Sequence, residues 1–387
     1  MSGAWLTGVL AVLSACLFAW SWLTVAPTPV RWLWKPAIAA TEWGHWLGAL
    51  ALVAAASEIA LGAPAWVLVP VLVAAVLFLL PVLRSLRAAR SIEERLAPAF
   101  PEDRPVRRRA PVVPSSLLHI RLPEDGPARH VYSEIDGTEL TLDLYGAGPA
   151  TSAPKTLIMV VHGGSWNSGD STQLSGMNRY LAGGGYPVAA INYRLAPRYR
   201  FPAPIEDIGA AIRYLERVRE GNAWDRVVLL GRSSGGHLAL LAAYSQVHPA
   251  IRGVVALYPP TDLVWSWQRP APARLMDSNG VIRDFLGGSP EDMPARFEAA
   301  SPIRLVRPDL PPTMLIHGGN DELVSPVQSR RLARELDRVG ARCMHLELPW
   351  GKHGMDANLA GPSGQITLYA LERFLAAVET GSPIAGS

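Results

Sequence analysis

The sequence predicts an α/β fold, in which a mostly parallel β-sheet is covered by helices on both faces and is preceded by transmembrane helices. Strand-like apolar runs alternate with helix-like segments from residue 156 to residue 378, and parallel strands need such crossover connections. One of these runs leads directly through Gly231-Arg232-Ser233-Ser234-Gly235 into a Leu- and Ala-rich helix. Before this domain, residues 1–83 hold nearly all of the apolar excess of the chain.

Residues 1–83 are expected to form a transmembrane region of about three helices. Residues 4–26 and 63–83 carry no charge, and each stretch is long enough to cross about 30 Å of hydrocarbon as a helix. Residues 43–62 are a third candidate, although a histidine and a glutamate interrupt its ends. The first residues lack the basic start of a secretory signal, so we expect the first helix to stay in the membrane.

The basic residues of this region predict its orientation. Arg31 and Lys35 lie in the first connection, and three arginines follow the last span. With three spans these two places lie on the same side, so the positive-inside rule places them, and the domain that follows, in the cytoplasm. If residues 43–62 do not cross, this agreement is lost and the side of the domain stays open.

Residues 84–115 are expected to link the membrane region to a catalytic domain at residues 116–387. The linker begins as a basic helix over residues 84–96 and then becomes rich in proline and arginine. Such a composition does not bury a core, so we expect this stretch to be extended or mobile. Its arginines either contact anionic lipid headgroups or are simply solvated.

The catalytic domain is expected to open with a β-hairpin, because residues 128–146 alternate in polarity on either side of Asp136-Gly137. Residues 263–300 later interrupt the alternation of strands and helices, and we interpret them as an insertion over the active site or a surface excursion. The other strands are expected at residues 156–161, 187–192, 227–230, 253–258, 313–317 and 343–348, and helices at residues 204–218, 326–338 and 365–378, besides the helix after Gly235.

The Gly-Arg-Ser-Ser-Gly motif is typical of a nucleophile elbow, because it stands between a strand and a helix. On such a sharp turn, side chains at Gly231 and Gly235 would collide with the neighbouring strand and helix. The hydroxyl of Ser233 would be exposed at the helix N-terminus, where free N–H groups can receive an oxyanion. The alternative is an ordinary strand-to-helix turn.

A nucleophilic serine needs a base and a third group that orients the base. His353 lies in a loop just past the last strand, which is where open α/β sheets place their chemistry, and we predict that it is the base. Asp321 follows the preceding strand in the same way and is the predicted orienting acid, with Asp262 as the alternative. Asp356 is interpreted as a solvated loop residue.

An oxyanion hole is predicted in residues 162–166, His-Gly-Gly-Ser-Trp, directly after a buried strand. The glycines let the backbone approach a substrate, so the N–H groups of Gly164 and Ser165, together with Gly163, are the expected donors. The amide of Ser234 completes the set. We expect His162 to stabilise this loop by hydrogen bonds and not to act as a base.

Together these motifs resemble the α/β-hydrolase superfamily, and within it the hormone-sensitive-lipase-like carboxylesterases and the neighbouring small bacterial esterases and formamidases. The resemblance covers about residues 115–380 and implies a serine hydrolase that uses no cofactor. It is carried by His162-Gly163-Gly164-Ser165-Trp166 with Gly169-Asp170, by Asn192-Tyr193-Arg194-Leu195-Ala196-Pro197 with Phe201-Pro202-Ala203, by Gly231-Arg232-Ser233-Ser234-Gly235-Gly236, by Asp321 and by His353-Gly354.

Two positions depart from the lipase-like pattern. Ser165 stands where those members often have a third glycine, which favours the feruloyl-esterase-like and formamidase-like neighbours. Arg232 precedes the serine, where other residues are frequent, and it contacts a polar substrate or pairs with a carboxylate. The N-terminal arrangement is similar to that of membrane-bound prenylcysteine methylesterases, which implies a lipidic ester substrate.

The resulting hypothesis is a membrane-anchored serine carboxylesterase that acts on a small-molecule or lipid ester. Amide or formamide hydrolysis and acyl transfer, with the same three residues, are the alternatives. A non-catalytic scaffold would have lost one of those residues, and all three are present. The aromatic side chains expected to line the substrate pocket are Trp166, Trp265, Trp267 and Trp350.

The composition excludes several other classes. The net charge is +3 and the basic residues are scattered or lie next to the membrane segments, so nothing indicates nucleic-acid binding. The two cysteines, Cys16 and Cys343, form neither a disulfide framework nor a zinc motif, and we expect no metal. The sequence carries no indication of an oligomeric state.

Overall fold

The computed structural model describes residues 2–99, 107–146, 156–218 and 224–380. Its centre is an eight-stranded sheet with the order β1-β2-β4-β3-β5-β6-β7-β8. The hairpin β1–β2 is antiparallel and pairs with β4 in antiparallel fashion, and the other neighbours are parallel. The strands are β1 (Ala128–Ile135), β2 (Thr138–Tyr145), β3 (Thr156–Val161), β4 (Val188–Ile191), β5 (Arg226–Arg232), β6 (Ile251–Leu257), β7 (Thr313–Gly318) and β8 (Cys343–Leu348).

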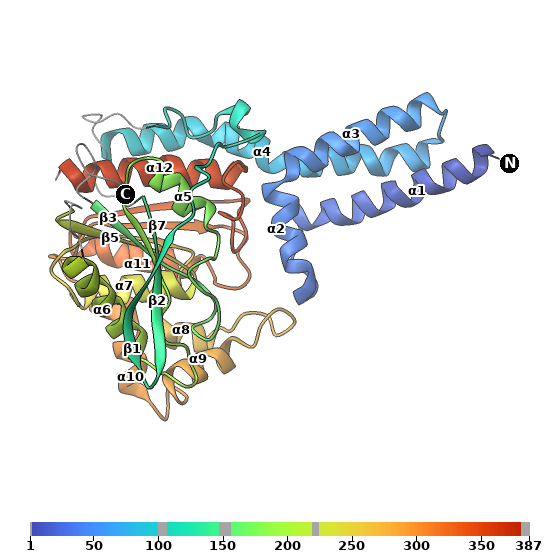
Figure 1. Ribbon diagram of the computed structural model, residues 1–387. Coiled ribbons are helices and arrows are strands. Elements are labelled where there is room, and N and C mark those ends of the chain that lie inside the picture. Colours follow the sequence, from blue (N-terminus) through green and yellow to red (C-terminus); the bar gives the residue numbers. More distant parts are fainter. Residues whose placement is uncertain (1, 100–106, 147–155, 219–223, 381–387) are drawn as a thin grey trace.

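Helices cover both faces of the sheet, as the sequence predicts (Figure 1). In β3, Leu157, Met159 and Val161 belong to one hydrophobic cluster, while Ile158 and Val160 belong to another. The continuous apolar runs are therefore buried on both faces, because alternate side chains enter different cores. The covering helices are α6 (Ala203–Val218), α7 (Ser234–Tyr244) and α11 (Val327–Arg338) on one face, and α5 (Gly176–Ala182) and α12 (Pro362–Thr380) on the other.

The expected insertion at residues 263–300 forms three short helices between β6 and β7. They are α8 (Leu263–Gln268), α9 (Ser278–Leu286) and α10 (Pro294–Ala299), followed by the 3-10 helix η4 (Pro302–Leu305). Phe285 and Phe297 are fully buried and join the larger hydrophobic cluster. The insertion is therefore packed onto the domain and is not a loose surface excursion.

The N-terminal helices project away from the sheet (Figure 1). They are α1 (Ser2–Ser21), α3 (Gly44–Ala60) and the first part of α4 (Ala65–Ala99), whose second part lies beside α12. Trp5–Thr24 and Ala65–Leu96 are long and apolar enough to cross a membrane, whereas Gly44–Ala60 is a shorter apolar helix. Between α1 and α3 the chain forms the 3-10 helices η1 (Trp22–Thr24) and η2 (Arg31–Leu33) and the helix α2 (Trp34–Glu42), and α2 lies next to the catalytic domain.

The structure differs from the expected linker at residues 84–115. The basic part simply continues α4 as far as Ala99, and Ile92 and Leu96 enter the core beside α12. Arg108 is buried: its guanidinium donates to Gln365 Oε1 (2.6 Å) and its amide donates to Glu372 (2.8 Å). The expected basic helix at residues 84–96 is therefore present as part of α4, and α12 supplies the apolar surface for Ile92 and Leu96. The expectation of an extended, solvated spacer is wrong for Arg108, because α12 supplies its hydrogen-bond acceptors. Residues 100–106 lie outside the described residues.

Candidate active site

The turn after β5 has the strained geometry of an elbow. Ser233 has φ 53° and ψ −122°, and its amide donates to the carbonyl of Leu257 at 2.9 Å. A Cβ at Gly231 would lie 2.2 Å from the carbonyl oxygen of Gly235. A Cβ at Gly235 would lie 2.2 Å from the last carbonyl of β3, that of Val161. Both glycines are thus required by close backbone contacts, as the motif predicts.

Three side chains from different loops meet beside this elbow. His353 Nε2 lies 2.9 Å from Ser233 Oγ, and His353 Nδ1 lies 2.6 Å from Asp321 Oδ2. These loops follow the carboxyl ends of β5, β7 and β8, which all lie in the parallel part of the sheet, with β6 between β5 and β7. With the proton on Nδ1, the histidine donates to the aspartate and accepts from the serine hydroxyl, so the three groups form one continuous hydrogen-bond chain.

Asp321 is held in place by more than His353. Its Oδ1 accepts the amides of Leu323 and Val324, each at 2.9 Å, and its Oδ2 also lies 3.3 Å from His317 Nε2. Burial acts to raise the pKa of Asp321, but the charge interaction with His353 and the hydrogen bonds from both histidines outweigh it and hold that pKa well below its ordinary value. The carboxylate therefore stays charged. Sequence reasoning missed the contact of His317, whose signal is its position four residues before Asp321.

The alternative acid, Asp262, has a different place in the fold. Its carboxylate caps α8 by accepting the amide of Trp265 at 3.0 Å, and it pairs with Arg331 at 3.0 Å. An acceptor at the N-cap satisfies a helix amide that has no partner within the helix. Asp262 is therefore engaged in shaping the insertion, and the structure places Asp321 at the histidine.

The loop after β3 turns its backbone toward the elbow. Gly164, Ser165 and Trp166 have φ values of 128°, 55° and 61° in succession. A Cβ at Gly164 would lie 2.1 Å from the carbonyl oxygen of Ser168, so only glycine fits there. Among the residues that the structure describes, no hydrogen bond engages the amides of Gly164, Ser165 or Ser234. These three N–H groups are therefore available to an oxyanion.

Gly163 does not belong to this set, which corrects the prediction. Its amide donates to Gln173 Oε1 at 2.8 Å, because the chain returns after the loop and brings Gln173 back to it. His162 supports the loop as expected, with Nδ1 2.8 Å from the carbonyl oxygen of Gly163 and its ring stacked on Tyr193. Burial lowers the pKa of His162. A neutral imidazole in this place suits a structural role.

Arg232 and Asp356 form a buried ion pair beneath the site. Arg232 Nε donates to Asp356 Oδ2, and both residues are only 1% exposed. The hydroxyl of Tyr258 donates to the other oxygen of the same carboxylate. The interpretation of Asp356 as a solvated loop residue is wrong, because two distant side chains satisfy it inside the fold. The sequence predicts that Arg232 either contacts a polar substrate or pairs with a carboxylate, and the structure shows the pairing with a carboxylate.

The predicted pocket tryptophans separate into two groups. Trp166 and Trp265 line one small cavity of about 50 Å³ between the insertion and the loop after Asp321. Trp350 instead lies in the core, 2% exposed, and donates to Ser363 Oγ at 3.0 Å, so it does not line this cavity. Trp267 packs edge-on against Phe297 within the insertion. Trp350 and Trp267 therefore pack against other side chains of the domain.

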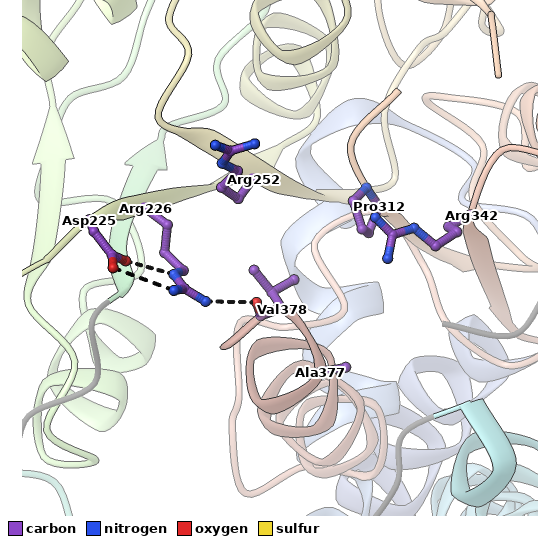
Figure 2. A pocket seen from close by; sticks show the side chains of 7 residues that line it. All are labelled: Asp225, Arg226, Arg252, Pro312, Arg342, Ala377 and Val378. Atoms are coloured by element: carbon purple, nitrogen blue, oxygen red, sulfur yellow. Dashed lines mark hydrogen bonds and ion pairs between the residues drawn. The ribbon is translucent and has the colours of Figure 1, made fainter. Parts of the chain in front are cut away.

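A larger cavity of about 480 Å³ lies elsewhere in the domain (Figure 2). It is at the amino ends of the strands, because Arg226 begins β5 whereas Ser233 follows the end of that strand. The seven residues of β5 separate the two places by roughly 20 Å at about 3.3 Å a residue. The lining residues are Asp225, Arg226, Arg252, Pro312, Arg342, Ala377 and Val378. This cavity is thus separate from the candidate active site.

Within the described parts of the chain, no group of three or more His, Cys, Asp or Glu side chains is arranged to hold a metal ion. Cys16 and Cys343 are free thiols, the first exposed and the second buried.

Two solved esterases share this fold. Esterase B from Lactobacillus rhamnosis matches with a TM-score of 0.57 and 26% identity, over 69% of this chain and 90% of that one. The thermophilic esterase Est2 of Thermogutta terrifontis matches with a TM-score of 0.54 and 26% identity, over 68% of this chain and 95% of that one. The fold is therefore that of the α/β-hydrolases, as the sequence predicts.

Curated relatives carry the same activity in their names. Esterase LipC of Mycobacterium tuberculosis is 29% identical over 288 residues, which are 70% of this chain and 69% of that protein. The probable carboxylic ester hydrolase LipM of the same organism is 28% identical over 253 residues, but the match spans only 56% of its length.

The class of protein follows from the fold and these relatives: the chain is a hydrolase of the carboxylesterase class. More narrowly, the BD-FAE family model matches residues 142–336, about half of the chain, and the chain belongs to the BD-FAE family. Ser233 and Asp321 lie inside the matched segment, and His353 follows it.

Proposed function

We propose that this protein is a membrane-anchored serine carboxylesterase in which Ser233 is the nucleophile, His353 the general base and Asp321 the group that orients the base. The observation that carries the proposal is the continuous hydrogen-bond chain from Asp321 through His353 to Ser233. These hydrogen-bonded side chains lie at the carboxyl edge of a parallel sheet, where open α/β folds place their active sites.

The mechanism follows from these positions. Ser233 Oγ attacks the ester carbonyl while His353 Nε2 takes the hydroxyl proton, and the charged Asp321 stabilises the imidazolium that forms. His353 then gives this proton to the departing alcohol oxygen, which leaves the acyl group on Ser233. Water, deprotonated by the same histidine, attacks the acyl-enzyme and releases the acid. Proton transfer of this kind contributes about 10²–10⁴ in rate.

The amides of Gly164, Ser165 and Ser234 are the proposed oxyanion donors. Free N–H groups at the start of α7 and in the loop after β3 stabilise the tetrahedral oxyanion more than the neutral carbonyl, since the charge develops only in the transition state. Removal of one such donor lowers kcat by about 10²–10³-fold. Trp166 and Trp265, which share a cavity beside this loop, are the proposed contacts for the substrate.

Anchoring by α1, α3 and the first part of α4 is a further part of the proposal. Supporting observations are the two long apolar helices and the contact between α3 and α4, which is made largely by alanines. Arg31 and Lys35 belong to η2 and α2, and α2 lies next to the catalytic domain (Figure 1). Arg84 follows the apolar first part of α4, and this distribution of basic residues favours a cytoplasmic domain. A C-terminal green-fluorescent-protein fusion should then fluoresce, and a C-terminal alkaline-phosphatase fusion should be inactive.

Hydrolysis of p-nitrophenyl acetate by the full chain in detergent tests the catalytic proposal. Ser233→Ala should lower kcat by at least about 10³-fold and abolish labelling by a fluorophosphonate. Ser245→Ala, at the exposed C-terminal end of α7, is the matched control and should behave as wild type. Retained hydrolysis in Ser233→Ala would show that another group is the nucleophile.

Adding an alcohol acceptor and analysing the products separates hydrolysis from acyl transfer.

A further inference from the structure

The chain between α1 and α3, residues 22–43, is here called the connecting segment, and it contacts the loops of both Asp321 and His353. On the acid side, the amide of Thr28 donates to Glu322 Oε2 at 2.7 Å. Arg274 of the insertion bridges the same two residues, because it donates to the carbonyl of Thr28 and to Glu322 Oε1, each at 3.0 Å. The connecting segment is thus fixed to the residue that follows Asp321.

On the base side, the ring of Trp34 lies beside the ring of His353, with centroids 6.2 Å apart. Both neighbours of His353 also meet the connecting segment. Lys352 Nζ lies 3.4 Å from the carbonyl oxygen of Ala26, and a Cβ on Gly354 would lie 3.2 Å from Ile38 Cδ1. The indole N–H of Trp34 is buried and has no hydrogen-bond partner within the described residues. A polar group of a bound molecule would satisfy it.

The end of the connecting segment is anchored by buried polar contacts. Glu42 is fully buried, and its carboxylate accepts the hydroxyl and the amide of Ser363 at 2.7 and 3.1 Å. Asn358 donates to the carbonyl of Glu42 at 2.7 Å. These contacts hold the connecting segment to the catalytic domain at a third place, so Trp34 stands on a fixed support next to His353.

The other side of the connecting segment is apolar and exposed. Trp32 is 74% exposed and Trp22 is 54% exposed, and the exposed Arg31 and Lys35 are close to Trp32 in the sequence. Tryptophan mixed with basic residues is the composition of a membrane interface. The connecting segment also continues at both ends into the apolar helices α1 and α3. We therefore take the lipid bilayer as the occupant of this face.

Given the proposed function, on which this inference rests, we propose that the substrate is a membrane-resident ester and that Trp34 is a wall of its binding site. The apolar chain of the ester would remain in the bilayer while its carbonyl reaches Ser233. Trp34 would contact the chain because it joins the bilayer face of the connecting segment to the ring of His353. Trp34 is thus assigned to specificity and not to the chemical steps.

Two esters with the same leaving group test this assignment in full-length protein reconstituted into phosphatidylcholine vesicles. p-Nitrophenyl acetate dissolves in water, whereas p-nitrophenyl palmitate resides in the bilayer. Trp34→Ala should lower kcat/KM for the palmitate roughly tenfold more than kcat/KM for the acetate, the size of lost apolar contacts in a pocket. Trp34→Phe should retain most palmitate activity. Trp32→Ala, the exposed neighbour, should keep the ratio of the two activities within about twofold of wild type.

Four results would overturn the inference. Equal loss of both activities in Trp34→Ala would mean that Trp34 acts through the fold or through His353. Wild-type activity with both esters in Trp34→Ala would mean that Trp34 does not contact the acyl chain. If wild type hydrolyses the acetate in a Ser233-dependent manner but not the palmitate, the substrate class is wrong while the proposed function stands. Failure with both esters, without labelling of Ser233, would overturn the proposed function as well.

Discussion

The ring of Tyr258 packs edge-on against the ring of His353, with ring centroids 4.6 Å apart. The hydroxyl of the same tyrosine donates to Asp356, which also pairs with Arg232. Arg232 directly precedes Ser233, so a buried charged cluster connects the residue before the serine to the ring that supports the histidine. The serine and the histidine are therefore positioned by one set of buried contacts as well as by their own hydrogen bond.

Tyr258→Phe should destabilise the protein and leave most of the activity. The ring that contacts His353 stays, but the buried carboxylate of Asp356 loses a hydrogen bond, which costs about 1.5–3 kcal/mol for a charged acceptor. Tyr244→Phe is the control and should cost about 1 kcal/mol, since that buried hydroxyl forms its hydrogen bond with the neutral hydroxyl of Thr313. Thermal denaturation of both variants in detergent measures the difference. Equal costs would show that Asp356 does not depend on Tyr258.

Arg232→Ala should be strongly destabilising, because it leaves the carboxylate of Asp356 buried without its cation. Removing one partner of a buried ion pair costs about 3–5 kcal/mol. Arg338→Ala breaks the exposed pair with Glu335 and should change stability by less than about 0.5 kcal/mol. Denaturation midpoints compare the two variants. A small effect of Arg232→Ala would mean that water reaches Asp356 or that its charge is neutralised.

Gly235→Ala should prevent correct formation of the elbow. Its Cβ would lie 2.2 Å from the carbonyl oxygens of both Val161 and His162, which belong to a buried strand end that cannot move away cheaply. We expect a loss of about 3 kcal/mol or more and loss of fluorophosphonate labelling at Ser233. Gly126→Ala, where no atom lies within 4 Å of the added Cβ, should stay within about 1 kcal/mol of wild type. Normal labelling of Gly235→Ala would contradict the geometry of the elbow.

Glu42 should make the stability of the protein depend on pH. Burial raises its pKa to about 8 in the folded state, from an ordinary value of 4.5. Between these values the folded state binds more protons than the unfolded state, so stability falls as the pH rises through this window. Glu42→Gln, which resembles the protonated side chain, removes this dependence. The melting temperature of Glu42→Gln minus that of wild type should therefore increase between pH 5 and pH 9. If this difference does not change with pH, Glu42 is not buried in its neutral form.

Much of the fold could be predicted from the sequence because it depends on short-range patterns. The apolar run of β3 and the turn Asp136-Gly137 are readable within a few residues, and both elements form where expected. The elbow is also readable from a short motif: Gly231 is required by the carbonyl of Gly235 within that motif, although Gly235 is required by the end of β3. Asp321 and His353 could be singled out because each follows a strand, and parallel strands bring such loops to one edge.

What the sequence determined by itself is therefore the α/β architecture, the elbow and the loops from which the candidate site is built. Only the tertiary structure decided which polar groups meet across long separations: Asp356 with Arg232, the amide of Gly163 with Gln173, and Trp34 with His353. Hydrophobic periodicity reports which face of an element is buried, but it carries no information about the partner of a buried polar group. A buried charge or N–H group without a partner costs free energy, so it is paired in the folded protein. The identity of the partner therefore depends on how the elements pack.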